Sequence, residues 1–126
     1  MNRKIVVGVR IIFGLLLVAM GSMAFMNFPI SQEMPEASRA FAQALADTGY
    51  MNYFTGIVEI LVGLMFVTRR YVALGAILLA PISVNIILFH IFLDLTTIVP
   101  GLILTALNIF VAYSEWGKYR EVLKAK

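Results

Sequence analysis

The sequence is dominated by four long apolar runs, separated by short polar or charged segments. They cover residues 5–28, 52–68, 71–93 and 95–114. The first run has no charged residue after Arg10, and the two middle runs are joined by the basic pair Arg69-Arg70. An α-helix rises about 1.5 Å per residue, so runs of this length can cross about 30 Å of hydrocarbon. The pattern therefore predicts four membrane-spanning helices.

Transmembrane β-strands would alternate between apolar and polar side chains, and these runs do not alternate. We expect an all-α fold, with the whole chain in a single domain of residues 1–126. The expected architecture is an integral membrane four-helix bundle whose helices run up-down-up-down.

A cleaved signal peptide is the alternative for the first run. A basic start and an apolar stretch precede small residues around Ser22-Met23-Ala24, which resemble a cleavage region. The three later runs would keep the chain in the membrane in either case.

The one long polar segment, residues 27–50, separates the first run from the second. Pro35 followed by Glu36 is typical of a helix start, because proline fits the first helical position and an acidic residue favours the first turn. Apolar side chains then recur at helical spacing, and Gly49 suits a helix end. We expect a short amphipathic helix over residues 35–48 on the periplasmic surface of the membrane. An ordered loop is the alternative.

The composition agrees with a membrane protein. Apolar residues make up 61% of the chain and charged residues only 13%, whereas soluble domains have about 25% charged residues. The net charge of +3 comes from basic residues beside the apolar runs, which favours a membrane surface over nucleic acid. The absence of cysteine excludes disulfides, thiolate metal sites and thiol catalysis by this chain. We find no nucleophile motif and therefore expect no autonomous catalysis.

The distribution of lysine and arginine predicts the orientation. Nine of these ten residues lie in the N-terminal segment, the Arg69-Arg70 turn and the C-terminal tail, and the long polar segment holds only Arg39. Cytoplasmic segments contain an excess of such residues, so both termini are expected in the cytoplasm. Trp116 and Tyr119 in the basic tail are typical of an anchor at the membrane surface.

Six polar side chains lie within or beside the apolar runs, where hydrocarbon would solvate them poorly. They are Arg10, Glu59, Asn85, His90, Asp94 and Asn108. Each must face a partner or a water-filled cavity, so each is a candidate member of a ligand site or of a buried polar network. Counted along the helices, Glu59 lies about 10 Å below the outer surface. We expect it to converge with His90, Asn85 and Asn108 in the outer half of the bundle.

Arg10 and Glu59 each share a helical face with two glycine residues, which indicates close helix packing on those faces. We expect Arg10 and Glu59 to form a pair, with a Glu59–His90 pair as the alternative. For His90 the simpler expectation is a hydrogen bond to Asp94 or to the backbone. No spacing between these residues selects for a metal ion, and none is expected.

Two segments resemble a family signature. They are FTGIVEILVGL at residues 54–64 and LAPISVNIILFH at residues 79–90. Both resemble the DoxX-like family of small four-helix bacterial membrane proteins, and the resemblance covers nearly the whole chain. It implies the bacterial inner membrane as the location. It also makes Glu59, Asn85 and His90 family positions, without giving them a catalytic role.

The resemblance implies an accessory membrane subunit, because the family is similar to the membrane subunit of a thiosulfate:quinone oxidoreductase. Since the chain has no cysteine, a redox role would need a quinone or a partner enzyme. We expect an outward-opening polar pocket for a quinone-like or lipidic molecule. The alternatives are a membrane assembly protein without a ligand and, more distantly, a small proton-coupled transporter. Expected partners are the lipid bilayer, a membrane or redox enzyme and further copies of the chain.

Overall fold

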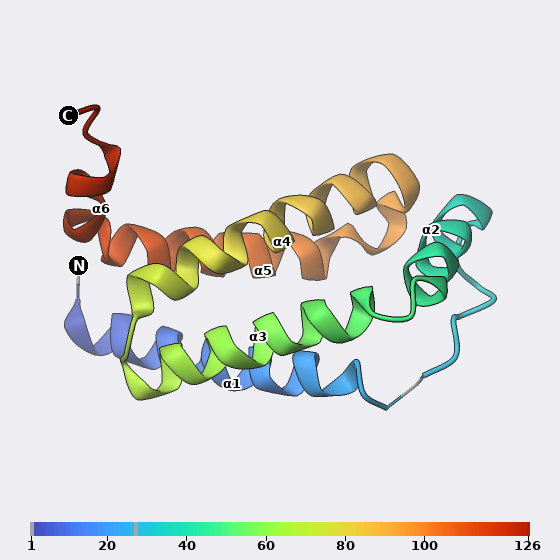
Figure 1. Ribbon diagram of the computed structural model, residues 1–126, viewed down its shortest axis with the longest axis horizontal. Helices are drawn as coiled ribbons and strands as arrows, with labels where there is room; N and C mark the ends of the chain where they lie inside the picture. The colour runs from blue at the N-terminus through green and yellow to red at the C-terminus, as the bar shows by residue number, and fades with distance from the viewer. Residues whose placement is uncertain (1, 27) are drawn as a thin grey trace.

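The computed structural model describes residues 2–26 and 28–126, and over these residues the chain is helical and has no β-strand. These residues form six α-helices and one short 3-10 helix. They are α1 (Arg3–Met23), α2 (Glu36–Asp47), α3 (Met51–Thr68), α4 (Val72–Leu93), η1 (Leu95–Thr97), α5 (Ile98–Ser114) and α6 (Trp116–Leu123). Figure 1 shows how the α-helices are arranged. The predicted all-α class is confirmed.

Four of these helical segments are long and apolar enough to cross a membrane. They are α1, α3, α4 and the combined segment Leu95–Ser114, which contains η1 and α5. Their number and positions agree with the four apolar runs of the sequence. By length and composition, the chain is a multi-pass membrane protein.

The first helix is shorter than its apolar run, which continues to residue 28. α1 ends at Met23, and the next three residues form tight turns in which each N–H donates to the carbonyl three residues earlier. Pro29 follows two residues after Asn27, which lies outside the described residues. The predicted boundary was therefore about one turn too long, because apolar composition alone does not mark where α1 ends.

A helix is present within the predicted range of residues 35–48. α2 begins at Glu36, directly after Pro35, and Gly49 beyond its end has a φ of +79°. Glycine adopts this left-handed conformation without steric cost, so it ends the helix as the sequence indicated. The hydroxyl of Thr48 accepts hydrogen bonds from the N–H groups of Tyr50 and Met51 (3.4 and 3.0 Å) and so connects α2 to the start of α3.

The C-terminal tail, predicted from the sequence only as a surface anchor, forms a helix. α6 turns away from the end of α5, as Figure 1 shows. The buried Tyr119 donates its hydroxyl to the carbonyl oxygen of Ala73 at 2.8 Å. This hydrogen bond fixes α6 beside the first turn of α4.

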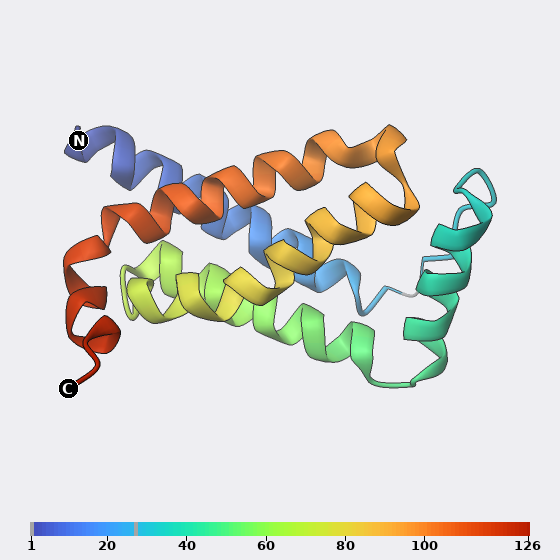
Figure 2. The same cartoon turned by 90° about the horizontal axis from the view of Figure 1, so that it is seen from above.

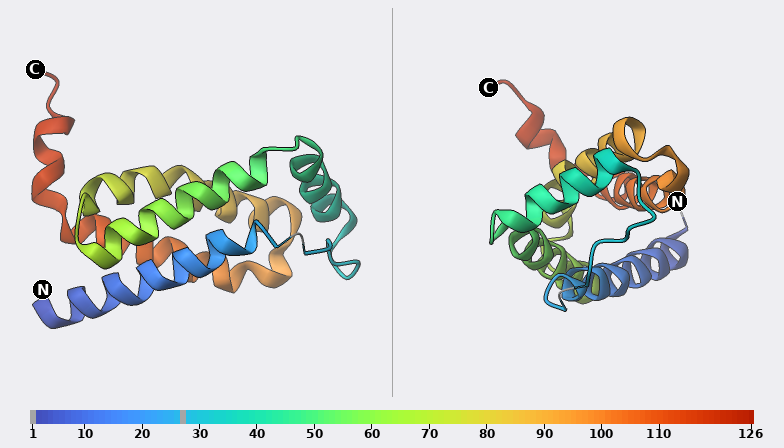
Figure 3. Two further views of the ribbon diagram at one scale, coloured as in Figure 1. Left: turned by 60° about the horizontal axis from the view of Figure 1, so that its bottom comes forward. Right: turned by 90° about the vertical axis from the view of Figure 1, so that its right-hand side faces the viewer.

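The long helices lie side by side, with α1 against α3 and α4 against α5. The N-terminus, α6 and the turn between α3 and α4 are at one end of the molecule, and α2 is at the other (Figures 1 and 3). Seen from above in Figure 2, α2 lies across the end of the bundle rather than along it. Every lysine and arginine of the N-terminus, the Arg69-Arg70 turn and the tail is thus at the end opposite α2.

Glycine pairs let α1 and α3 approach closely. A Cβ atom added to Gly14 would lie 2.7 Å from the carbonyl oxygen of Gly63, and one added to Gly63 would lie 2.6 Å from that of Gly14. Gly21 and Gly56 face each other in the same way, at 2.5 and 2.7 Å. Any side chain at these positions would collide with backbone, so the close packing predicted for the glycine-lined faces is confirmed.

The apolar core occupies only part of the bundle. Its buried side chains are Phe13, Leu17, Val62, Phe66, Val72, Ala76, Leu79, Leu104 and Val111. Among the described residues, none of them comes from α3 before Val62 or from α4 after Leu79. The core contributions of α3 and α4 therefore lie next to the Arg69-Arg70 turn, and in the half next to α2 neither of these two helices has a buried apolar side chain among its described residues.

Candidate functional site

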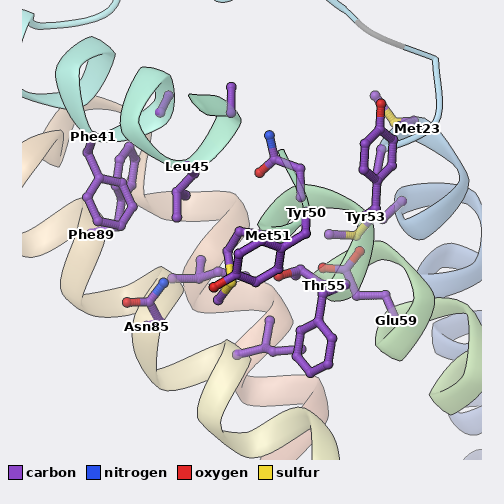
Figure 4. A pocket seen from close by; sticks show the side chains of 18 of the residues that line it. Met23, Phe41, Leu45, Tyr50, Met51, Tyr53, Thr55, Glu59, Asn85 and Phe89 are labelled. Carbon is purple, nitrogen blue, oxygen red and sulfur yellow. The ribbon is translucent and has the colours of Figure 1, made fainter. Parts of the chain in front are cut away.

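A cavity of about 940 Å³ lies in the half of the bundle next to α2. Its walls come from the end of α1, from α2, from the first half of α3 and from the second half of α4; Figure 4 shows many of the lining side chains. Its aromatic members are Phe28, Phe41, Tyr50, Tyr53, Phe54 and Phe89. Its polar members besides tyrosine are Asn52, Thr55, Glu59, Asn85 and His90. Methionine, leucine, isoleucine and alanine side chains make up most of the rest.

Three of the six predicted site residues line this cavity: Glu59, Asn85 and His90. In Figure 4, Glu59 approaches from α3 on one side and Asn85 from α4 on the other. Arg10, Asp94 and Asn108 are buried elsewhere and do not line it. The structure thus divides the six predicted residues into a cavity group and a group of structural contacts.

Glu59 is the most unusual residue of the cavity. Only 8% of its surface is exposed, yet across residues 2–26 and 28–126 it has no hydrogen bond and no ion pair. It lies on the same face of α3 as Gly56, where α1 packs closely, so the helix cannot turn the carboxyl away to lipid. A buried carboxyl without a partner costs free energy, which indicates that something other than this chain satisfies it.

Arg10 does not pair with Glu59, which corrects the sequence-based prediction. Its Nε donates instead to the carbonyl oxygen of Phe66 at 2.8 Å. The glycine contacts set an antiparallel register in which Arg10 lies level with the last turn of α3. Glu59 is seven residues before Phe66, about two turns or 10 Å further along α3. The sequence placed both residues on packing faces but did not determine this register.

His90 forms a local cluster with the residues that follow α4. Its Nδ1 lies 3.1 Å from the backbone oxygen of Asp94 and 3.3 Å from the hydroxyl of Thr97. Since a carbonyl oxygen only accepts, Nδ1 is the donor in the hydrogen bond to Asp94. The expectation that His90 bonds to Asp94 or to the backbone is confirmed, and the alternative pair with Glu59 is not formed.

The Asp94 carboxylate joins α4 to η1. It accepts hydrogen bonds from the hydroxyls of Thr96 at 2.6 Å and Thr97 at 2.9 Å. The bond from Thr96 and, to a smaller extent, the bond from Thr97 hold the pKa of Asp94 below its ordinary value. Asp94 therefore shapes the turn that positions His90 and does not face the cavity itself.

The imidazole of His90 is held between two neighbours. Phe89 meets it edge to face, with ring centroids 5.1 Å apart. On the other side, a Cβ atom added to Gly101 would lie 3.0 Å from its Cδ2, so glycine there gives the ring its space. The sequence does not indicate this role for Gly101, because the contact joins α4 to α5 and cannot be predicted from either helix alone.

Asn108 is part of a separate polar contact between α4 and α5. Its Oδ1 accepts from the hydroxyl of Ser83 at 3.0 Å, and its Nδ2 donates to the carbonyl oxygen of Ala76 at 3.2 Å. None of the described residues of α5 lines the cavity. The expected convergence with Glu59, His90 and Asn85 thus does not include Asn108, which faces α4 instead.

The residues that place α2 over the cavity were not predicted as site residues. The hydroxyl of Ser38, which is fully buried, donates to the carbonyl oxygen of Leu93 at 2.7 Å, and Phe41 packs on Phe89 with ring centroids 5.5 Å apart. Both contacts attach α2 to the end of α4. The helical spacing of apolar residues in α2 indicated a packing face, but not what that face would cover.

No family model, no curated protein and no solved structure matches this chain. The resemblance to the DoxX-like family therefore stays a prediction that rests on residues 54–64 and 79–90. In the part of the chain that the structure describes, no three His, Asp or Glu side chains gather as metal ligands would. The geometry instead provides a half-open cavity with one carboxyl, one imidazole and several amide and hydroxyl groups.

Proposed function

We propose that this chain is an accessory subunit of the bacterial inner membrane whose cavity binds a lipid-soluble molecule with an apolar body and a polar head. The observation that supports this most is Glu59, a buried carboxyl without a partner that faces a cavity of about 940 Å³. Ligand pockets typically measure about 300–1,000 Å³ and combine apolar walls with a few polar groups. The cavity has both properties.

A purely structural role would leave a different arrangement. Two polar side chains that join helices in this protein have hydrogen-bond partners: Asn108 with Ser83 and Ala76, and Arg10 with Phe66. Glu59 has no such partner among the described residues, and the space in front of it is not filled by side chains. A ligand or bound water is needed to satisfy it.

The charge distribution supports an outward-facing cavity. The basic N-terminus, turn and tail are at the end opposite α2, as Figure 3 shows. Under the positive-inside rule that end is cytoplasmic, the four long helices run up-down-up-down, and α2 lies as an amphipathic helix at the periplasmic surface. The cavity then opens in the outer half of the membrane.

A quinone or a lipid suits this arrangement. The apolar body would contact the methionine, isoleucine and aromatic side chains, and the polar head would meet Glu59, Asn85 and His90. Because the chain has no cysteine, a redox role would pass through the quinone or through a partner enzyme. This is the role that the resemblance to the DoxX-like family implies.

Binding to the purified protein tests this proposal. We expect decylubiquinone, or a lipid that copurifies and is seen by native mass spectrometry, to bind in a one-to-one ratio. Ala42→Trp should fill the cavity and abolish binding, since Ala42 lines it, while Ala40→Trp on the exposed face of α2 should not. If no lipid-soluble molecule binds, the proposal is wrong and the assembly protein without a ligand takes its place.

A small proton-coupled transporter is a second candidate. A single buried carboxyl in a cavity that opens to the surface can bind a proton and a substrate in turn, and Glu59 has this placement. Proteoliposomes with an imposed pH gradient would then accumulate a substrate, and Glu59→Gln would abolish the accumulation. Binding without transport would leave the accessory role as the function.

A further inference from the structure

The cavity is lined by one acidic side chain, and its lining includes His90 but no lysine or arginine among the described residues. Glu59 is the only Asp or Glu among its lining residues, and no lysine or arginine lines it within residues 2–26 and 28–126. Arg10, the basic residue buried between α1 and α3, donates to Phe66 about two helical turns away from Glu59. Within the described residues, no lysine or arginine lies opposite this carboxyl, and His90 on the far wall forms no ion pair with it.

Aromatic rings surround the same space. Six of the lining residues are phenylalanine or tyrosine, contributed by α2, by α3, by α4 and by the segments that flank α2. Tyr53 lies on α3 six residues before Glu59, Tyr50 directly precedes α3, and the Phe41–Phe89 pair lies on the opposite side under α2 (Figure 4). The faces of such rings carry negative electrostatic potential and attract organic cations. Phe41 and Phe89 are partly buried, and the other four rings are exposed.

The end of the molecule around the cavity is acidic as well. Outside the spans it contains the exposed Glu33, Glu36 and Asp47 and the buried Asp94. The one basic residue there is Arg39, whose guanidinium donates to Gln32 and to the carbonyl oxygen of Met34, both at 3.1 Å. A surface with this balance of charge raises the local concentration of cations and repels anions.

We infer that the ligand of this cavity is an organic cation with an apolar body, whose positive charge is balanced by Glu59 and whose substituents pack on the aromatic rings. This inference rests on the proposed binding function and adds that the polar head of the ligand is positively charged. The carboxylate, the aromatic side chains of the lining and the acidic end of the molecule all favour a cation over a neutral or anionic molecule of the same size.

Three lipid-soluble probes distinguish recognition of the ligand's charge from recognition of its size and shape. Tetraphenylphosphonium and tetraphenylborate have nearly the same size and opposite charge, and decylubiquinone is neutral. We expect the full-length protein in detergent, measured by equilibrium dialysis, to bind the phosphonium at least about tenfold more tightly than the borate. Equal binding of the two ions, or tighter binding of decylubiquinone, would overturn the inference and leave the proposed function intact. If none of the three binds, the proposed function fails with it.

Variants of Glu59 test whether this carboxyl recognises the charge. Glu59→Gln should weaken phosphonium binding at least about tenfold, because an ionic contact is lost, and Glu59→Asp should retain part of it. Glu33→Gln removes the same charge from the acidic end outside the cavity and should change binding less than about twofold, as expected for an exposed, screened charge. Melting curves of each variant show that it is folded. Undiminished binding by folded Glu59→Gln would contradict the inference.

Discussion

In the half of the bundle next to the Arg69-Arg70 turn, the closed half, apolar side chains fill the space between α3 and α4. In the half next to α2, the open half, the same two helices border a cavity of about 940 Å³. Buried polar side chains of the two halves also differ in whether they have hydrogen-bond partners. Asn108 in the closed half has partners for both its amide oxygen and its nitrogen, whereas Glu59 in the open half has none among the described residues. The buried amide of Asn108 thus joins two helices, whereas the buried carboxyl of Glu59 faces a cavity.

The aromatic residues show the same contrast. Phe13 and Phe66 pack on each other in the closed half, with ring centroids 5.7 Å apart, and both are fully buried. In the open half Phe41 and Phe89 make a similar contact at 5.5 Å but remain partly exposed and line the cavity. Both halves therefore contain packed phenylalanine pairs, but in the open half the pair borders the cavity and in the closed half it is part of the core.

The largest effect is expected in the closed half, at the contact between α1 and α3. Gly63→Ala places a Cβ atom 2.6 Å from the carbonyl oxygen of Gly14, and backbone cannot yield as a side chain could. We expect the free energy of unfolding in detergent to fall by about 1–3 kcal/mol. Gly8→Ala, where no atom lies within 4 Å, is the matched control and should not destabilise the protein. Equal effects of the two changes would show that the contact does not support the fold.

Two asparagines provide the next comparison. Asn108→Ala removes the contacts to Ser83 and Ala76 and leaves the Ser83 hydroxyl buried without its partner, which we expect to cost about 1–2 kcal/mol of stability. Asn85 is exposed and lines the cavity, so Asn85→Ala should change stability by less than about 0.5 kcal/mol. Chemical or thermal unfolding of both variants gives the result. A stability loss for Asn85→Ala as large as that for Asn108→Ala would remove the distinction between the halves.

The smallest effect is expected at the edge of the open half, where Asp94 accepts hydrogen bonds from Thr96 and Thr97. Its pKa is lowered below the ordinary 3.8 in the folded protein, so this carboxylate stabilises the fold fully above that value. The stabilisation is lost as the pH falls below 3.8 and through the folded-state pKa. Asp94→Asn should therefore flatten the dependence of stability on pH in that acidic range. An unchanged slope would show that the carboxylate does not stabilise the turn.

The sequence was sufficient to predict what depends on a single helix. The four apolar segments, the helix after Pro35 and the glycine-lined faces that bear Arg10 and Glu59 are all properties of local composition and spacing. Burial of Glu59 followed from its place between Gly56 and Gly63, because a face that packs against another helix cannot turn to lipid.

The features that could not be predicted from the sequence depend on how two helices pack against each other. Arg10 bonds to Phe66 instead of Glu59 because the register between α1 and α3 is set by contacts along the whole interface. Asn108 and Asn85 have similar predicted depths, but α5 packs on the side of α4 away from the cavity, which no count along a single helix could show. The helix α6 was missed since its position depends on the Tyr119 contact with Ala73.

The most direct measurement of the central claim compares Glu59→Gln with the wild-type protein in two assays, unfolding without ligand and binding of a lipid-soluble probe. If the open half exists to bind a ligand, the variant should be as stable as the wild type or more stable, because no partner within the described chain is lost. It should also bind decylubiquinone or tetraphenylphosphonium, whichever the wild-type protein binds, at least about tenfold more weakly. A loss of stability as large as that of Asn108→Ala, with binding unchanged or absent in both proteins, would contradict the account.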